Sequence, residues 1–285
     1  MKPSKSYSYG QLSVPGIVLV YFLLFLFSIV FLFPLCWMFL TSVKELGAIY
    51  LVPPQWIPKV FQWENYMKIF RDYPLGTYLS NSVEYTIIST FGIVLSSSLV
   101  AFGFARIRAR GKDPLFALVL ATMMLPYQVT MIPQYLLFRK LGWVDSYLPL
   151  VIPAFTGSAF IIFLLRQFYI GLSKDLDEAV SIDGGGYFTI FFRIIIPLSL
   201  PAMATAGIME FMYRWNDLLG PLIYLNTTNK FPLALGLANF TSSYGATQWN
   251  ILMTAAVVSV IPPLLLFFTA QKYFIQGIVV HASKD

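Results

Sequence analysis

The chain has 285 residues, of which 58% are hydrophobic and only 11% are charged. Because soluble domains carry about 25% charged residues, this composition excludes an ordinary soluble protein and requires a bilayer around much of the chain. The net charge of +6 does not indicate nucleic-acid binding, because the basic residues cluster between apolar runs and no basic face with interleaved aromatic residues is present.

Six stretches are long and apolar enough to cross a membrane, which takes about 20 mostly apolar residues. They cover residues 14–40, 81–105, 115–137, 147–165, 198–222 and 251–270. The first is too long for the apolar part of a signal peptide and lacks an early small-residue cleavage site, so we expect a retained helix. The sequence therefore predicts an all-α integral membrane protein with six transmembrane helices.

The short loop after the second stretch indicates the orientation. It contains Arg106, Arg108, Arg110 and Lys112, and short loops rich in Arg and Lys stay in the cytoplasm. With six spans, both termini are then cytoplasmic as well. The predicted organisation is a cytoplasmic tail (1–13), a first span (14–41), an extracytoplasmic loop (42–80) and a membrane core (81–285). Segments 139–146 and 223–250 are expected outside, and 171–197 in the cytoplasm.

Local signals mark helix ends and breaks in the spans. Asn81 followed three residues later by Glu84 is typical of a helix N-terminus, so we expect Asn81 to cap the second span, although Glu84 could instead line a pore. Leu125-Pro126 and Pro262-Pro263 are expected to break or kink their helices, because proline removes a backbone donor and clashes with the preceding turn.

The cytoplasmic segment 171–197 predicts a helix-turn-helix outside the bilayer. Ser173 can cap the first helix, and the acidic residues that follow favour its positive end. That helix should stop at residues 183–186, where glycines permit a sharp turn, and a second short helix should run toward Pro197. Glu178 offers a carboxylate to an arginine of a partner protein. Residue chemistry alone leaves two alternatives: a docking element or an ordinary solvated connector.

Polar residues within the fifth stretch are candidates for a translocation path, because polar groups in a span usually face a pore or another helix. Glu210 and Arg214 are four residues apart on one helical face and could form an ion pair. Such a pair could seal a subunit interface, or the group could contact a solute, since sugars are bound by aromatic rings and planar hydrogen-bonding groups. The candidates are Glu210, Tyr213, Arg214, Trp215, Asn216 and Asp217, with Tyr127, Gln128 and Gln134 near the third stretch.

The sequence lacks the residues that ATP binding, metal binding and several kinds of catalysis require. No phosphate-binding G-x-x-x-x-G-K-[ST] motif occurs, so an ATP-driven process would need another subunit. The single histidine, His281, and the single cysteine, Cys36, do not support a metal site, a disulfide or histidine-relay chemistry. We find no catalytic set and expect no cofactor bound by this chain.

The 171–197 segment resembles the EAA motif of the membrane subunits of ABC importers. That motif is Glu-Ala-Ala, three residues, Gly, nine residues, and then I-x-L-P. The chain matches it at Glu178, Ala179, Gly184, Ile194 and Pro197, with Val180 and Ile196 as mild departures. The resemblance implies that Glu178, Ala179, Asp183, Gly184, Ile194 and Pro197 contact and couple to a cytoplasmic ATPase.

Other stretches are similar to the shorter six-helix permease of the maltose-type sugar importers. They include Asn81-Ser82, residues 104–106, residues 125–133, Trp215-Asn216 and residues 231–233. The similarity extends over residues 21–276 and implies the type I ABC importer permease fold. The last nine residues, 277–285, depart from the tail of that family, which often touches the ATPase.

The resemblance implies a membrane-spanning subunit of an ATP-driven, binding-protein-dependent importer for an oligosaccharide or another carbohydrate, in the inner membrane of a bacterial or archaeal cell. The implied partners are a second, longer permease subunit, two cytoplasmic ATPase subunits that use ATP and Mg, an extracytoplasmic solute-binding protein, the carbohydrate and membrane lipid, but no nucleic acid. The alternatives are an importer of a non-sugar solute and a secondary transporter, for which membrane-embedded acidic residues would be expected.

Overall fold

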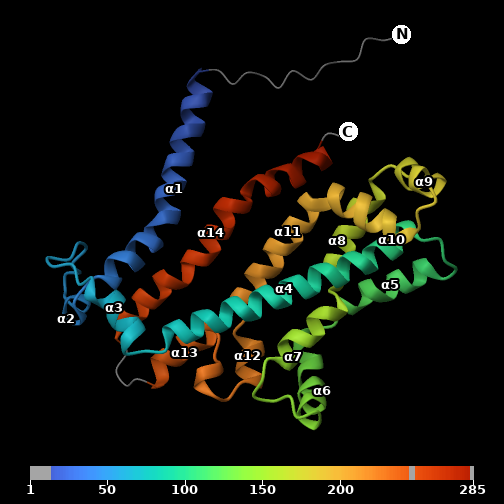
Figure 1. The fold of residues 1–285 in the computed structure, drawn as a ribbon. Coiled ribbons are helices and arrows are strands. Elements are labelled where there is room, and N and C mark those ends of the chain that lie inside the picture. Colours follow the sequence, from blue (N-terminus) through green and yellow to red (C-terminus); the bar gives the residue numbers. More distant parts are fainter. Residues whose placement is uncertain (1–13, 244–247, 283–285) are drawn as a thin grey trace. The chain divides into compact units, whose positions relative to one another are not determined.

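The computed structural model describes residues 14–243 and 248–282, and every regular element in them is helical (Figure 1). The predicted N-terminal tail, 1–13, lies outside the described residues, and so does the end of the chain from residue 283. In the helical residues 272–282 the backbone alone is described, so the side chain of His281 is outside the description. The all-α prediction is confirmed for this part of the chain.

Five helical stretches in the described residues are long and apolar enough to cross a membrane, and a bent helix pair makes a sixth when counted as one span. The five are Val14–Ser42, Leu75–Arg106, Leu148–Ile170, Tyr187–Trp215 and Trp249–Gln271, and the bent pair is Lys112–Thr122 with Tyr127–Lys140. These correspond in order to the six predicted runs, so the six-span prediction is confirmed with the third span broken.

The break in the third span lies where the sequence predicts it. Helix α5 (Lys112–Thr122) and helix α6 (Tyr127–Lys140) meet at 93°. Pro126 disfavours helical conformation in the residue before it, which ends α5 ahead of Leu125. Pro262 and Pro263, in contrast, lie inside helix α14 (Trp249–Ala282), which continues through them and is not broken. Neighbouring helices in a membrane protein make such prolines tolerable.

The predicted cap at Asn81 is wrong. Helix α4 (Leu75–Arg106) begins after Pro74, so Asn81 and Glu84 lie within the helix rather than at its start. The Asn81 amide instead donates hydrogen bonds to the carbonyl oxygens of Asn229, at 2.9 Å, and Phe231, at 3.0 Å. The Asn81 side chain, which the local pattern assigned to helix capping, therefore bonds to a segment far away in the sequence.

The fourth and fifth spans are irregular. The fourth consists of helix α7 (Leu148–Val151), the 3-10 turn η1 (Ile152–Thr156) and helix α8 (Ala159–Ile170), with Gly157 at φ +89° between the last two. The fifth consists of helix α10 (Tyr187–Ile190), the π-helical turn η2 (Phe191–Ile195) and helix α11 (Ile196–Trp215). The second helix of the predicted helix-turn-helix is α10, and it continues through η2 and past Pro197 into the fifth span, as expected for a helix that re-enters the membrane.

A proline explains the wide turn η2. A helical proline lacks a backbone donor and presses against the carbonyl four residues earlier, which for Pro197 is Arg193. Arg193 lies within η2, so the wider turn relieves this contact, while Pro197 itself lies in the first turn of α11, where proline is tolerated. The helix is thereby able to continue past the proline.

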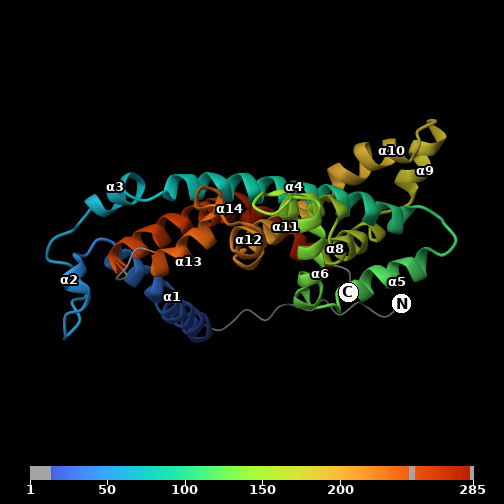
Figure 2. The ribbon, with the colours of Figure 1, turned by 90° about the horizontal axis from the view of Figure 1, so that it is seen from below.

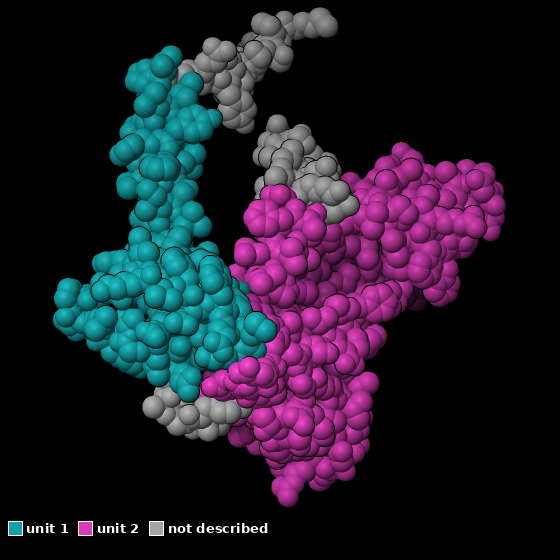
Figure 3. Space-filling view, turned by 60° about the vertical axis from the view of Figure 1, so that its left-hand side comes forward, with its two compact units in different colours: residues 1–68, 248–257 teal, residues 69–247, 258–285 magenta. Residues whose placement is uncertain are grey.

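The described chain divides into two compact units, which we treat separately (Figure 3). Unit 1 comprises residues 1–68 and 248–257, and includes α1 (Val14–Ser42), α2 (Leu46–Ile49), most of α3 (Glu64–Arg71) and the start of α14. The end of α1 is its anchor: the carbonyl of Ser42 accepts hydrogen bonds from the Asn65 amide, at 2.8 Å, and the Thr254 hydroxyl, at 3.1 Å.

Unit 2 comprises residues 69–247 and 258–285 and is built around α4, which packs along α8 and α11 (Figure 2). The contact surface is mainly apolar, with fully buried Leu165 on α8 and Ala206 on α11, and it includes a polar contact in which the Ser98 hydroxyl lies 2.7 Å from the Tyr169 hydroxyl. Unit 2 also contains α9 (Asp175–Ile182), α12 (Leu219–Tyr224), η3 (Thr228–Lys230) and α13 (Leu233–Ser243).

Candidate functional site

Helix α9 starts one residue later than a cap at Ser173 implies, although Ser173 bonds to its first residue. The Ser173 hydroxyl accepts a hydrogen bond from the backbone N–H of Asp175, at 3.2 Å, and donates one to the Asp175 carboxylate, at 2.9 Å. The helix itself is assigned from Asp175, with Lys174 as the flanking residue. Asp175, Asp177 and Glu178 all lie in the first turn, where their charges complement the helix dipole.

The glycine turn that ends α9 is also confirmed. Gly184 has φ +79°, a conformation that glycine adopts without steric cost. The backbone N–H of Gly184 donates to the Ser181 carbonyl, at 3.1 Å, and that of Gly185 to the Val180 carbonyl, at 2.8 Å. This pair of bonds is the Schellman motif, which satisfies the last carbonyls of a helix and reverses the chain sharply.

An ion pair fixes α9 to the end of α4. Arg106, whose side chain is only 3% exposed, lies 3.0 Å from the carboxylate of Asp177. The same guanidinium donates to the carbonyl oxygens of Leu172, at 3.0 Å, and Ser173, at 3.4 Å. In the sequence analysis Arg106 indicated the orientation of the chain, and its ion pair with Asp177 was not predicted. Arg106 Nε and Asp177 Oδ1 are buried and lack a hydrogen-bond partner among the described residues, so the pairing uses one bond where a fork of two is available.

The predicted coupling residues are found at two places along this segment. Glu178, Ala179, Asp183 and Gly184 are exposed on α9 and its turn. Ile194 is half-buried within η2, and Pro197 is exposed at the start of α11. Within the described part of the chain Glu178 forms no ion pair, so its carboxylate is open to a partner while the adjacent Asp177 is held.

The second candidate site is a cavity of about 590 Å³ in unit 2, which we call the Arg214 cavity. The predicted ion pair is present: Arg214 Nε lies 2.7 Å from Glu210 Oε1. Arg214 Nη1 also donates to the Tyr85 hydroxyl, at 3.2 Å, and that hydroxyl donates to the Asp217 carboxylate, at 2.7 Å. The buried Tyr85 therefore bridges one cation and one carboxylate that line the cavity, although Tyr85 itself is not part of the lining.

The Arg214 cavity brings some of the predicted path residues together and leaves others out. Tyr127, Glu210, Tyr213 and Arg214 line it, and Gln134, Asp217 and Tyr224 do so as well. Three predicted residues are not part of the lining. Trp215 is buried, and its indole donates a hydrogen bond to the Ser259 carbonyl, at 3.1 Å. The Asn216 amide donates to the Met212 carbonyl one helical turn earlier, at 2.7 Å. Gln128 is exposed and does not line the cavity.

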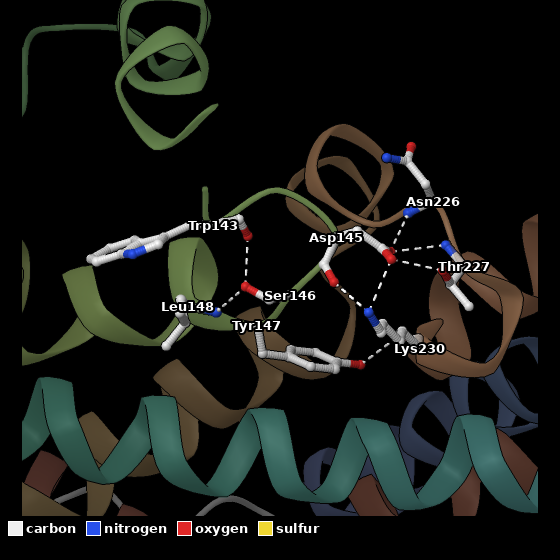
Figure 4. Close-up of polar contacts among 8 residues, drawn as sticks. All are labelled: Trp143, Asp145, Ser146, Tyr147, Leu148, Asn226, Thr227 and Lys230. Carbon is white, nitrogen blue, oxygen red and sulfur yellow. Dashed lines mark hydrogen bonds and ion pairs between the residues drawn. The ribbon is translucent and has the colours of Figure 1, made fainter. Parts of the chain in front are cut away.

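A third polar group, the Asp145 cluster, ties the loop after α6 to the loop after α12 (Figure 4). The Asp145 carboxylate accepts backbone hydrogen bonds from Asn226, at 3.0 Å, and Thr227, at 2.9 Å, and lies 2.9 Å from Lys230 Nζ. The Tyr147 hydroxyl donates to the Lys230 carbonyl, at 2.8 Å. The backbone N–H of Thr227, followed by that of Asn226, holds the pKa of Asp145 well below its usual range.

Comparison with known proteins places the chain in a family. The model of binding-protein-dependent transport system inner membrane components matches residues 92–280, about two thirds of the chain. The chain belongs to this family. It is therefore a multi-pass permease component of an ABC importer, a class that works with an ATPase and a binding protein.

Individual relatives match over nearly the whole length. The chain is 34% identical to the arabinooligosaccharides transport system permease protein AraQ of Bacillus subtilis (strain 168), over 96% of this chain and 98% of the relative. It is 32% identical to the sn-glycerol-3-phosphate transport system permease protein UgpE of Yersinia enterocolitica, over 87% and 90%. A crystal structure of a bacterial ABC transporter involved in import of the acidic polysaccharide alginate matches with a TM-score of 0.81 and 25% identity, over 96% of this chain and all of that one.

Proposed function

We propose that this permease component forms half of the translocation path of an ATP-driven carbohydrate importer. Its partners would be a second, longer permease subunit, two cytoplasmic ATPase subunits and an extracytoplasmic solute-binding protein. ATP and Mg would be used by the ATPase subunits, and this chain would bind no cofactor. Support for a carbohydrate comes from relatives named for arabinooligosaccharides and alginate, which this chain matches over at least 96% of its length.

The 171–197 segment is the proposed coupling element. Glu178 would bind an arginine of the ATPase, with Ala179, Asp183 and Gly184 forming the rest of the docking surface. The observation that carries this proposal is the contrast between two adjacent carboxylates. Asp177 is held by Arg106 at the end of α4, whereas Glu178 is exposed and unpaired among the described residues. A force applied at Glu178 would reach α4 through a charged contact rather than through a loose loop.

Movement would reach the solute path by two routes. The first is α4 itself, which packs against α8 and α11. The second is the continuous helix through η2, on which Ile194 and Pro197 lie between α9 and the Arg214 cavity. A nucleotide-driven shift between two packings of these helices would alternate the access of the path.

The Arg214 cavity is the proposed solute-facing surface. Tyr127 and Tyr213 offer aromatic rings with hydroxyl groups, and Glu210 with Arg214 offers charged hydrogen-bonding groups. Cavities that bind small molecules combine these features in a comparable volume. Trp215 and Asn216 would act on the packing of α11 rather than on the solute, because neither lines the cavity.

The test is Glu178→Arg in the complete complex, with Asp175→Asn as a matched control that also alters one carboxylate in the first turn of α9. We expect Glu178→Arg to abolish co-purification of the ATPase, or ATPase stimulation by the solute-loaded binding protein, while the two permease subunits still co-purify. The control should retain both.

Normal assembly and stimulated turnover of Glu178→Arg would refute the coupling proposal. If the wild-type chain never co-purifies with an ATPase, the assignment of Glu178 to ATPase docking is refuted as well. The solute is tested separately, by measuring which sugars stimulate hydrolysis in the wild-type complex.

A further inference from the structure

A concavity next to α9 is lined by Glu178 and the Arg106–Asp177 pair of the coupling proposal, and also by three basic residues that the coupling proposal does not use. The concavity has a volume of about 190 Å³ and lies between the end of α4, the loop that follows it, and α9. In Figures 1 and 2 these three elements gather at the same end of unit 2. The charged side chains of its lining are Arg106, Arg108, Lys112 and Lys174, with Asp177 and Glu178.

The charges in this concavity are unbalanced. Arg106 is engaged by Asp177, which leaves three cations and only the Glu178 carboxylate. Arg108 and Lys174 form no ion pair with a described residue, and Lys112 makes only a long hydrogen bond, 3.4 Å, to the Ile107 carbonyl. Three cations on the lining of one concavity attract an anion. The volume of the concavity is sufficient for a phosphate group and a few water molecules, since one water occupies about 30 Å³.

The surroundings indicate which anion would be present. The loop joins two apolar spans, so its basic residues lie at the edge of the hydrocarbon region. Leu115 and Leu118 on α5, which are 57% and 64% exposed, lie three and six residues after Lys112. A second concavity of about 400 Å³ shares Arg108 and Lys112 with the first and is also lined by Arg110. A ligand with an anionic head and apolar chains would match these basic concavities and the exposed leucines of α5.

We propose that this concavity binds the phosphate group of an anionic phospholipid. Basic pockets beside membrane helices recognise such headgroups. The headgroup phosphate accepts hydrogen bonds from Arg108, Lys112 and Lys174, and its acyl chains lie along the exposed leucines of α5. Because Lys174 immediately precedes α9, the lipid connects the loop after α4 to the start of that helix, and occupancy of the site stiffens the junction.

The experiment compares lipid retention by the purified complex. Wild type, Arg108→Gln/Lys112→Gln and Arg139→Gln/Lys140→Gln complexes are placed in nanodiscs of phosphatidylcholine with phosphatidylglycerol, and the phosphatidylglycerol retained is measured by native mass spectrometry. The control pair removes the same two charges from exposed residues at the end of α6. Arg108 and Lys112 line the concavity and Arg139 and Lys140 do not, so the affinity for phosphatidylglycerol should fall in the first variant only. At roughly fivefold for each basic residue, the expected fall is about 30-fold.

A free-phosphate arm distinguishes the source of the phosphate. Inorganic phosphate is titrated into the wild-type complex in pure phosphatidylcholine nanodiscs, with protection of the 106–112 loop from hydrogen exchange as the measurement. Protection by phosphatidylglycerol but not by millimolar inorganic phosphate supports the lipid. Protection by inorganic phosphate without lipid retention overturns it, as does equal retention in both double variants. A variant that retains lipid but loses the ATPase would assign the basic residues to ATPase docking instead, and would also overturn the proposal.

Discussion

The guanidinium of Arg106 lies 3.0 Å from the carboxylate of Asp177, and this contact joins the end of α4 to the first turn of α9 across 71 residues of sequence. Removing one partner of a buried ion pair strongly destabilises the folded protein, because the other charge stays desolvated without its counter-charge. The contact therefore makes a quantitative prediction.

Arg106→Gln is expected to lower the free energy of unfolding by about 3 kcal/mol, and Asp177→Asn by a smaller amount because Asp177 is more exposed. The double variant should lose less than the sum of the two, with a coupling energy of roughly 1–3 kcal/mol. Chemical unfolding of the purified complex in detergent measures the cycle. Strictly additive losses would mean that the two side chains do not interact.

Gly184→Ala should loosen the end of α9. An L-residue in the left-handed conformation costs about 1 kcal/mol, whereas Gly186, at φ −93° with open space around its Cα, should accept alanine freely. The amide of Gly185, which bonds to the Val180 carbonyl, is the reporter. Its hydrogen exchange should accelerate about fivefold in Gly184→Ala and remain unchanged in Gly186→Ala. Equal exchange in the two variants would show that the turn does not depend on Gly184.

Tyr85→Phe should destabilise unit 2 although it removes a single oxygen. The Tyr85 hydroxyl joins Arg214 to Asp217, and its loss leaves two charged groups each short of a hydrogen bond, at a cost of about 2 kcal/mol. Tyr135→Phe is the matched control, because Tyr135 contacts Tyr224 through its ring, with the centroids 6.2 Å apart. Thermal unfolding should separate the two variants by several degrees. A Tyr85→Phe protein as stable as the control would mean that water replaces the hydroxyl.

The Asp145 cluster predicts a dependence of stability on pH. The folded pKa of Asp145 is lowered, chiefly by the backbone donors of Thr227 and Asn226, from an unfolded value of about 3.9. Its carboxylate therefore stabilises the fold above about pH 4, and this stabilisation is lost as the pH falls through the folded pKa.

Melting temperatures of wild type and Asp145→Asn should differ most near neutral pH and converge in acid. Glu64→Gln is the control, because the exposed pair of Glu64 with Lys68, 3.6 Å apart, contributes little at any pH. A difference between wild type and Asp145→Asn that does not change from pH 7 to pH 3 would contradict this assignment.

The sequence predicted those features that depend on local composition. Six apolar stretches are sufficient to place six spans, because the bilayer sets their length and excludes charge. The approximate start and the end of α9 were also predictable from local sequence. Ser173 and Gly184 bond to backbone groups within a few residues of themselves. The Glu210–Arg214 pair followed from helical spacing alone.

Contacts between distant residues were not predictable in this way. Tyr85 is 129 residues from Arg214 in the sequence, and nothing in its neighbourhood marks it as a partner of that arginine. Asn81 was misassigned because its cap-like pattern is local, while its hydrogen-bond partners lie about 150 residues away. Trp215 and Asn216 have the right chemistry for a solute, but the direction of a side chain on α11 depends on its packing.

The π turn η2 has a consequence for the direction in which α11 faces. The helical span from Tyr187 to Trp215 covers 29 residues, about 43 Å, so α10 and the Glu210–Arg214 pair lie on one continuous helix that includes η2. A π turn holds one residue more than an α turn, which rotates everything beyond it by about 100° about the axis. With a regular α turn in place of η2, Arg214 would face away from Tyr85. The extra residue of the wide turn therefore determines which face of α11 contributes to the lining of the cavity.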